Sequence, residues 1–288
     1  MKKDKLHIHW YPGHIAKAER QLKEMLSLVD VVIEVRDARL PLSSSYANIE
    51  KLLGNKPRLL LLNKADLVEK DELKTELQPW VEYLKKENDC PIITTNAKGN
   101  IDLTKVVKYA VELSEPKILA LMEKGLLRRS ARAMVVGMPN VGKSSVINKL
   151  TKSSKTKIGA KAGVTKQQQW VRINPKLDLL DTPGIIPTKQ DDQVQAAKLA
   201  FVSSVSENAY SPVPVSKLFL EIVSKTKYVN NLLEYYNIKT IEDLTLENIA
   251  LNRNWITKGA TPDPERTARN ILKDFREGRL GLMILDTL

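Results

Sequence analysis

The sequence predicts two domains: an α/β domain with a mostly parallel sheet flanked by helices over residues 1–187, and an all-helical domain over residues 188–288. The first is indicated by nearly continuous apolar runs such as residues 29–35, which alternate with helical patterns, as expected for strands buried on both faces of a parallel sheet. The second is indicated by five helical patterns with apolar faces after residue 191. A chain of 288 residues is long enough to form two such cores.

Composition excludes several classes of protein. With 42% hydrophobic residues the chain is expected to fold, and no apolar run approaches the length of a membrane span. The N-terminal residues are charged and lack the apolar centre of a signal peptide. Cys90 is the only cysteine, so no disulfide can form within the chain, and we interpret it as a packing residue. These features favour a cytoplasmic protein.

The net charge of +12 is confined to the first domain. Residues 1–187 contain 33 Lys and Arg against 21 Asp and Glu, whereas residues 188–288 contain 13 of each. Residues 124–177 contain thirteen basic residues and no acidic one. A solvated lysine-rich face around a nucleotide site is one interpretation. We favour a polyanion such as RNA, because the stretch exceeds what one triphosphate needs.

The N-terminal segment contains all three histidines of the chain. His7 and His9 could bind a metal as a His-x-His pair, but no further histidine or cysteine pair completes a transition-metal site. His14 follows a Pro-Gly turn and begins a helix, from which its side chain could be held toward a neighbouring site. The strand at residues 29–35 then ends in a polar loop, residues 36–41, at the edge where open α/β sheets bind ligands.

The remaining elements follow from the same periodicities. Strands are expected at residues 58–62, 91–95, 132–136, 169–173 and 177–180, and helices at 71–87, 101–113 and 145–150, with a polar connection from 115 to 124. The second domain is expected to contain helices at residues 193–205, 215–223, 228–236, 241–250 and 264–277.

Asn63, Lys64, Ala65 and Asp66 follow the strand at residues 58–62 and form the motif NKAD. A fixed carboxylate at Asp66 would accept from the ring NH and the exocyclic amine of guanine, and it would repel the edge of adenine. Asn63 would brace neighbouring loops, and the Lys64 stem would cover the base. The loop after the strand at 91–95 would hold the guanine carbonyl through backbone amides of Asn96, Ala97 and Lys98.

The sequence GMPNVGKS at residues 137–144 has the spacing of a phosphate-binding loop between a strand and a helix. Its glycines let backbone NH groups face phosphate oxygens, Lys143 would neutralise the β- and γ-phosphates, and Ser144 would bind Mg²⁺. The N-terminus of the next helix also favours an anion. The expected nucleotide contacts here are Pro139, Asn140, Val141, Gly142, Lys143, Ser144 and Ser145.

Two shorter motifs follow the loop helix. Residues 151–166 are expected to form a mobile loop ending in Gly-Val-Thr, where the Thr165 hydroxyl would complete the Mg²⁺ shell when a γ-phosphate is present. The strand at 177–180 ends in Asp-Thr-Pro-Gly, in which Asp181 would hold Mg²⁺ through water and the Gly184 amide would contact the γ-phosphate. Lys143, Thr165 and Gly184 are therefore catalytic candidates.

These motifs occur in the order NKAD, TNAKG, phosphate loop, GVT, DTPG, whereas in an ordinary GTPase the phosphate loop comes first. The chain resembles a circularly permuted P-loop GTPase, and WYPGH, DARLP, NKAD, GMPNVGKS, GVTKQQQW and DTPGI resemble the ribosome biogenesis GTPase A (YlqF) family over about residues 8–187. The resemblance implies a GTPase that binds GTP or GDP with Mg²⁺, is stimulated by the ribosomal particle and acts in late maturation of the large ribosomal subunit. The implied partners are that subunit and ribosomal RNA, and DNA is not expected as a partner. The protein is expected to be a monomer and to have no membrane span.

Three residues carry finer expectations. Ile185 occupies the position where many GTPases have the glutamine that orients the attacking water, and isoleucine cannot hydrogen-bond water. Another group must then position the water; His14 is our candidate, the alternative being that it packs or caps locally. Asn140 matches an asparagine that helps to bind a monovalent cation in potassium-activated relatives, which predicts a K⁺ requirement.

The permutation places the DTPG strand directly before the helical domain, so movement at the γ-phosphate would reach that domain as an order–disorder switch. In the family this domain contacts ribosomal RNA. Two other functions stay open from the sequence: a GTPase of a pathway without RNA, and an RNA-binding module whose affinity GTP tunes, which Ile185 supports. Intact Lys143, Ser144, Thr165 and Asp181 argue against the second.

Overall fold

The computed structural model describes residues 6–8, 12–68, 76–99, 102–152, 156–157, 170–181, 184–185 and 192–288, with only the backbone of residues 12–16, 156–157 and 184–185. The chain forms two compact units. The sheet unit comprises Pro12–Pro187 with Leu288, and the helical unit comprises Thr188–Thr287 with Met1–Tyr11. The first eleven residues are thus grouped with the helical unit, although the sequence placed them in the α/β domain.

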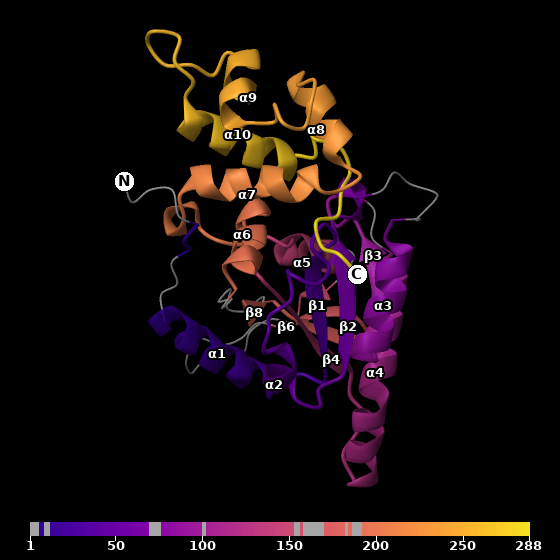
Figure 1. Ribbon diagram of the computed structural model, residues 1–288. Coiled ribbons are helices and arrows are strands. Elements are labelled where there is room, and N and C mark those ends of the chain that lie inside the picture. The colour runs from indigo at the N-terminus through magenta and orange to yellow at the C-terminus, as the bar shows by residue number, and fades with distance from the viewer. Residues whose placement is uncertain are drawn as a thin grey trace. The chain divides into compact units, whose positions relative to one another are not determined.

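One sheet organises the sheet unit (Figure 1). Among the described residues its strands are β1 (Val31–Asp37), β2 (Arg58–Asn63), β3 (Ile92–Thr95), β4 (Ala131–Gly137), β5 (Thr156–Lys157), β6 (Trp170–Asn174), β7 (Leu177–Leu180) and β8 (Gly184–Ile185). The order is β3-β2-β1-β4-β7-β6-β5, and β8 also pairs with β4. All pairings are parallel except β6 with β7 and β5 with β6. The predicted α/β class is confirmed.

The central strands are buried because their sequences are apolar on both faces. Every residue of β1 and β2 is buried, and β4 is buried except at Arg132. Helices pack against these strands and supply the covering layers that a parallel sheet needs. The helices of this unit are α1 (Pro12–Leu26), α2 (Ile49–Leu53), α3 (Gln78–Asn88), α4 (Leu103–Glu123) and α5 (Lys143–Lys152), with a short 3₁₀ helix η1 (Ala65–Leu67).

Helix α4 corrects one prediction. The sequence placed a polar connection at residues 115–124, but the helix continues to Glu123 with Pro116 inside it. Ser114 and Ile118 are buried on the same stripe as Val106 and Ala110, so the packed face runs past the proline. We infer that this packing outweighs the backbone hydrogen bond that a helix-interior proline removes.

The helical unit contains α6 (Gln193–Phe201), α7 (Pro212–Ser224), α8 (Val229–Tyr236), α9 (Leu246–Asn252) and α10 (Pro264–Arg276), and a 3₁₀ turn η2 (Glu207–Ala209). Its core includes Phe219, whose ring centroid lies 5.3 Å from that of Phe201 and 5.0 Å from that of Phe275. Three aromatic side chains from α6, α7 and α10 therefore join these helices. Nowhere in the described part of the chain is a helix both long and apolar enough to span a membrane.

Two helix boundaries in this unit differ most from prediction. The helix expected at 241–250 begins at Leu246, because the Thr245 hydroxyl accepts from the Asn248 backbone NH at 3.2 Å and caps it. The helix expected at 193–205 ends at Phe201. Ser203 has a φ of 62°, a left-handed conformation that does not continue a helix.

Candidate functional site

The loops that carry the predicted nucleotide-binding motifs meet at one edge of the sheet because the strands that precede them are parallel. Asp37 is in register with Asn63, and Asn63 with Thr95, so β1, β2 and β3 end side by side. Strand β4 runs parallel to β1 and leads into the phosphate loop at the same edge. Ligands of open α/β sheets bind at this carboxyl edge.

The phosphate loop has a backbone that requires glycine at two positions. Gly142 has a φ of 105°, and a Cβ there would lie 2.1 Å from Asn63 Nδ2. A Cβ on Gly137 would lie 2.5 Å from the Val35 carbonyl oxygen. The loop can therefore approach β1 and the NKAD motif only without these side chains. Asn140, also with a positive φ of 60°, is exposed at the tip.

Lys143 begins α5 and is the buried cation of the loop. Its side chain is 7% exposed, and Nζ donates to the Met138 carbonyl oxygen at 2.6 Å. Burial lowers the pKa of Lys143 to about 8. No carboxylate among the described residues pairs with this ammonium, and the adjacent helix N-terminus favours a bound anion. Beside it Pro139 and Ser145 are half-buried, Val141 is buried and Ser144 is exposed.

Asn63 joins the three loops of the site. Its Nδ2 donates to the Val141 carbonyl oxygen at 2.8 Å, and its Oδ1 accepts from the Ala97 backbone NH at 2.9 Å and from Thr95 Oγ1 at 3.3 Å. The side chain is 3% exposed. One amide therefore holds the phosphate loop, the NKAD loop and the TNAKG loop together.

Lys64 makes a second connection between loops. It has a left-handed backbone with a φ of 64°, and its Nζ donates to the Asn140 carbonyl oxygen at 2.7 Å and to Asp37 Oδ2 at 2.8 Å. Burial lowers the pKa of Lys64, an effect that the Asp37 carboxylate opposes. Asp66 lies in η1 and is exposed.

The TNAKG loop turns around the side chain of Asn96. Asn96 Oδ1 accepts from the backbone NH groups of Lys98 at 3.1 Å and Gly99 at 3.0 Å. Ala97 is buried and Lys98 exposed. Lys149 of α5 donates to the Gly99 carbonyl oxygen at 2.8 Å, which ties this loop to the phosphate-loop helix.

The magnesium and γ-phosphate candidates are only partly described. Asp181 follows β7, which is parallel to β4, and is exposed. The Gly184 backbone pairs with β4 opposite Val136, directly before the phosphate loop. His14 lies in the first turn of α1, but its side chain, like Thr165, His9 and the side chain of Ile185, lies outside the described residues.

Sequence reasoning missed the Asp37 carboxylate. Asp37 is 0% exposed; Oδ1 accepts from Arg39 Nε at 2.9 Å, and Oδ2 from Arg39 Nη2 and Lys64 Nζ, both at 2.8 Å. Burial opposes its ionisation, but the charges of Arg39 and Lys64 outweigh burial and hold the pKa of Asp37 below its usual range. The available signal was the polar DARLP segment at a strand end, to which the sequence assigned no partner.

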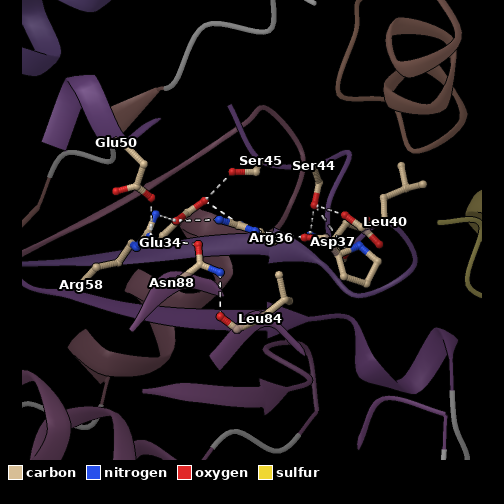
Figure 2. Close-up of polar contacts among 11 residues, drawn as sticks. Glu34, Arg36, Asp37, Leu40, Ser44, Ser45, Glu50, Arg58, Leu84 and Asn88 are labelled. Carbon is tan, nitrogen blue, oxygen red and sulfur yellow. Dashed lines mark hydrogen bonds and ion pairs between the residues drawn. The ribbon is translucent and has the colours of Figure 1, made fainter. Parts of the chain in front are cut away.

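A second buried carboxylate, Glu34, lies further back on β1 (Figure 2). It accepts from Arg36 Nε at 2.7 Å, Arg58 Nη1 at 3.1 Å and Ser45 Oγ at 3.3 Å. Burial opposes its ionisation, and the two arginines outweigh burial and lower the pKa of Glu34. Arg58 also donates to Glu50 at 2.7 Å, so the cluster fixes β1, β2 and α2.

Three arginines of residues 124–177, the stretch without acidic residues, form ion pairs with carboxylates from other parts of the sequence. Arg128 pairs with Glu115 at 2.7 Å, Arg129 with Asp30 at 2.6 Å and Arg172 with Asp178 at 2.9 Å. These carboxylates come from outside residues 124–177. Part of the local positive charge is therefore neutralised within the sheet unit.

The residues at this edge fit a nucleoside phosphate. A buried, carboxylate-free lysine, a loop whose glycines leave no room for side chains and a helix N-terminus together suit a phosphate group. The exposed Ser144 hydroxyl and Asp181 carboxylate are oxygen donors of the kind that Mg²⁺ prefers.

Comparisons with known proteins agree with this arrangement. A family model described as 50S ribosome-binding GTPase matches residues 132–247, which begin at β4 and leave NKAD and TNAKG upstream. Ribosome biogenesis GTPase A of Bacillus cereus is 38% identical over 97% of this chain and 94% of its own length. A GDP-bound YlqF structure (29% identity, 93% and 98% covered) and a GNP-bound YlqF structure from T. maritima (30%, 94% and 97%) each match with a TM-score of 0.65.

Proposed function

The chain belongs to the ribosome biogenesis GTPase A family and is a GTPase, and we propose that it assists late maturation of the large ribosomal subunit. The observation that supports the GTPase part of this function best is the meeting of the phosphate, NKAD and TNAKG loops at one sheet edge, joined by Asn63. Such an edge can hold a guanine nucleotide in one pose. The names of the relatives support the ribosomal role.

Recognition of GTP divides between two groups of residues. Asp66 would accept from the guanine ring NH and amine, the Lys64 stem would cover the base, and the amides of Asn96, Ala97 and Lys98 would face the guanine carbonyl. The backbone of residues 139–145 would donate to the phosphates. Asn63 would keep the two groups at a fixed distance through its bonds to both loops.

Hydrolysis would depend on charge stabilisation. Lys143 would offset charge that develops on the transferring phosphoryl group, and the Gly184 amide would contact the γ-phosphate. Ser144, Thr165 and Asp181 would hold Mg²⁺, directly or through water, and the ion supplies further charge neutralisation when bound. His14 would position the attacking water in place of the usual glutamine, and Asn140 would help to bind K⁺.

The ribosomal particle would act as the activator. Residues 124–177 are rich in Lys and Arg, and those not paired within the sheet unit can bind RNA phosphates. The DTPG strand continues directly into the helical unit along the chain, so loss of the γ-phosphate would be transmitted there. We propose that the protein acts in this way as a cytoplasmic monomer.

The proposal is tested by GTP hydrolysis in K⁺ buffer with and without purified large ribosomal subunits, with small subunits as the matched control. We expect stimulation by the large subunit alone, reduced in Na⁺ and lost in His14→Ala. Stimulation retained in the variant would remove His14 from the mechanism. Equal rates with and without large subunits would contradict the ribosomal role and favour a pathway without RNA.

A further inference from the structure

The end of strand β1 supplies an anion to the nucleotide loops. Lys64 Nζ donates to the Asp37 carboxylate at 2.8 Å and to the Asn140 carbonyl oxygen at 2.7 Å. One ammonium therefore connects the loop after β1, the NKAD loop and the phosphate loop. Asp37 begins the DARLP motif, but the sequence assigned this anion no role in nucleotide binding.

The Asp37 carboxylate is fixed independently of Lys64. Arg39 donates to both carboxylate oxygens, and its backbone NH donates to Oδ1 at 3.1 Å. The Asp37 backbone NH donates to Ser44 Oγ at 3.0 Å. Asp37 and Arg39 are 0% and 2% exposed, so packing holds this pair in place.

The position of Lys64 depends on this carboxylate. A lysine side chain has four rotatable bonds and a strongly hydrated charge, and burial disfavours that charge at Lys64. A fixed anion beside the ammonium compensates for lost hydration. Without it the side chain would gain by turning to solvent and would release the Asn140 carbonyl.

We propose that Asp37 is a positioning residue for guanine-nucleotide binding, which holds Lys64 against the Asn140 carbonyl and so fixes the spacing between the NKAD loop and the phosphate loop. Asp37 acts through Lys64 and Arg39 orients Asp37. The proposal rests on the assignment of Lys64 to the nucleotide site made under the proposed function.

A double-mutant cycle on GDP affinity tests this. Calorimetric titration with GDP would compare the wild type, Asp37→Asn, Lys64→Met and the double variant. We expect each single substitution to weaken binding about tenfold or more, the range for a hydrogen bond to a charged group. In the Lys64→Met background Asp37→Asn should have little further effect, because the residue through which it acts is gone.

Glu34→Gln is the matched control, since it also converts a buried, arginine-paired carboxylate on β1 to an amide. It should leave the GDP affinity of the folded protein unchanged. A loss as large as that of Asp37→Asn would show a general packing effect and overturn the proposal. Steady-state kinetics add a second readout: Asp37→Asn should raise KM for GTP more than it lowers kcat.

The double-mutant cycle distinguishes a failure of the assignment of Lys64 to the nucleotide site from a failure of the inferred role of Asp37. Unchanged affinity in Lys64→Met would refute the assignment of Lys64 and the inference with it. Weakened binding in Lys64→Met with wild-type binding in Asp37→Asn, or with additive losses, would overturn the inference alone. If Asp37→Asn does not fold because Arg39 is left buried without its anion, the neutral pair Asp37→Asn/Arg39→Gln is used, with the same expected results.

Discussion

Two buried carboxylates on strand β1 lie three residues apart and serve different parts of the protein. Glu34 is paired with Arg36 and Arg58, and neither arginine belongs to a nucleotide motif. Asp37 ends the strand, and its partner Lys64 is a residue of NKAD. Similar chemistry therefore supports the fold in mid-strand and the binding site at the carboxyl edge of the sheet.

Lys143 completes the comparison because it is buried without such compensation. Its ammonium meets the neutral Met138 carbonyl, and burial lowers its pKa, whereas both carboxylates on β1 have pKa values lowered by cationic partners. A charge that the protein pairs can stabilise the fold. A charge kept for an anionic ligand is expected to cost stability.

Lys143→Met should produce the largest effect on activity. Loss of the cation at the transferring phosphoryl group should lower GTP hydrolysis by about a hundredfold or more, measured as phosphate release. Lowering a lysine pKa to about 8 corresponds to about 3 kcal/mol against the charged form at neutral pH. The free energy of unfolding should therefore rise by about 1–3 kcal/mol, once the lost bond to Met138 is allowed for. If Lys143→Met were less stable than the wild type, this would contradict the inference that the unpaired charge of Lys143 costs stability.

Glu34→Gln should lower the stability of the protein and leave GTP hydrolysis unchanged, the opposite of Lys143→Met. Removing one partner from a buried charge cluster leaves Arg36 and Arg58 incompletely compensated and should lower the free energy of unfolding by about 3 kcal/mol. Urea unfolding measures this change. Hydrolysis per folded molecule should stay at the wild-type level; a parallel loss of activity would show that the mid-strand cluster also shapes the site.

Nucleotide affinity should depend on pH through Lys143. Phosphates favour the protonated ammonium, whose pKa burial lowers to about 8. Below that pH the lysine is already charged and the Kd for GDP should be constant; above it, binding must also take up a proton, and Kd should rise by up to about tenfold per pH unit. Titrations from pH 7 to 9 measure this. Lys143→Arg, which stays charged, should flatten the curve; an equally steep curve in that variant would exclude Lys143 as its origin.

Thr245 lies in the helical unit, and Thr245→Ala should have the smallest effect of the substitutions considered. It removes the hydroxyl that caps α9 and should lower the free energy of unfolding of that unit by about 1 kcal/mol. Calorimetry measures the change. GTP hydrolysis without ribosomal subunits should be unaffected, and a loss would show that α9 supports the nucleotide site.

The sequence predicted strands β1 to β4, β6 and β7 and the positions of the site loops because their signals are local, whereas the two-residue strands β5 and β8 were not predicted. Apolar runs give β1, β2 and β4, and the parallel arrangement brings NKAD and GMPNVGKS to one edge. The edge was therefore predictable from patterns and strand direction alone.

The rest depends on contacts between distant residues. The continuation of α4 through Pro116 depends on a buried stripe that local propensity opposes. The pairing of Asp37 with Lys64 joins residues 27 positions apart. The arginines of the acid-free stretch find carboxylates such as Asp30, 99 positions away from Arg129. Sequence patterns mark such residues as polar but do not identify their partners.

The thermal shift produced by GDP in the wild type, Glu34→Gln and Lys143→Met tests the central claim most directly, since a ligand that binds the folded state raises its unfolding temperature. We expect Glu34→Gln to start from a lower temperature and keep the shift, and Lys143→Met to start from a higher temperature and lose most of it. Loss of the shift in Glu34→Gln, or its full retention in Lys143→Met, would contradict the separation of fold and ligand charges.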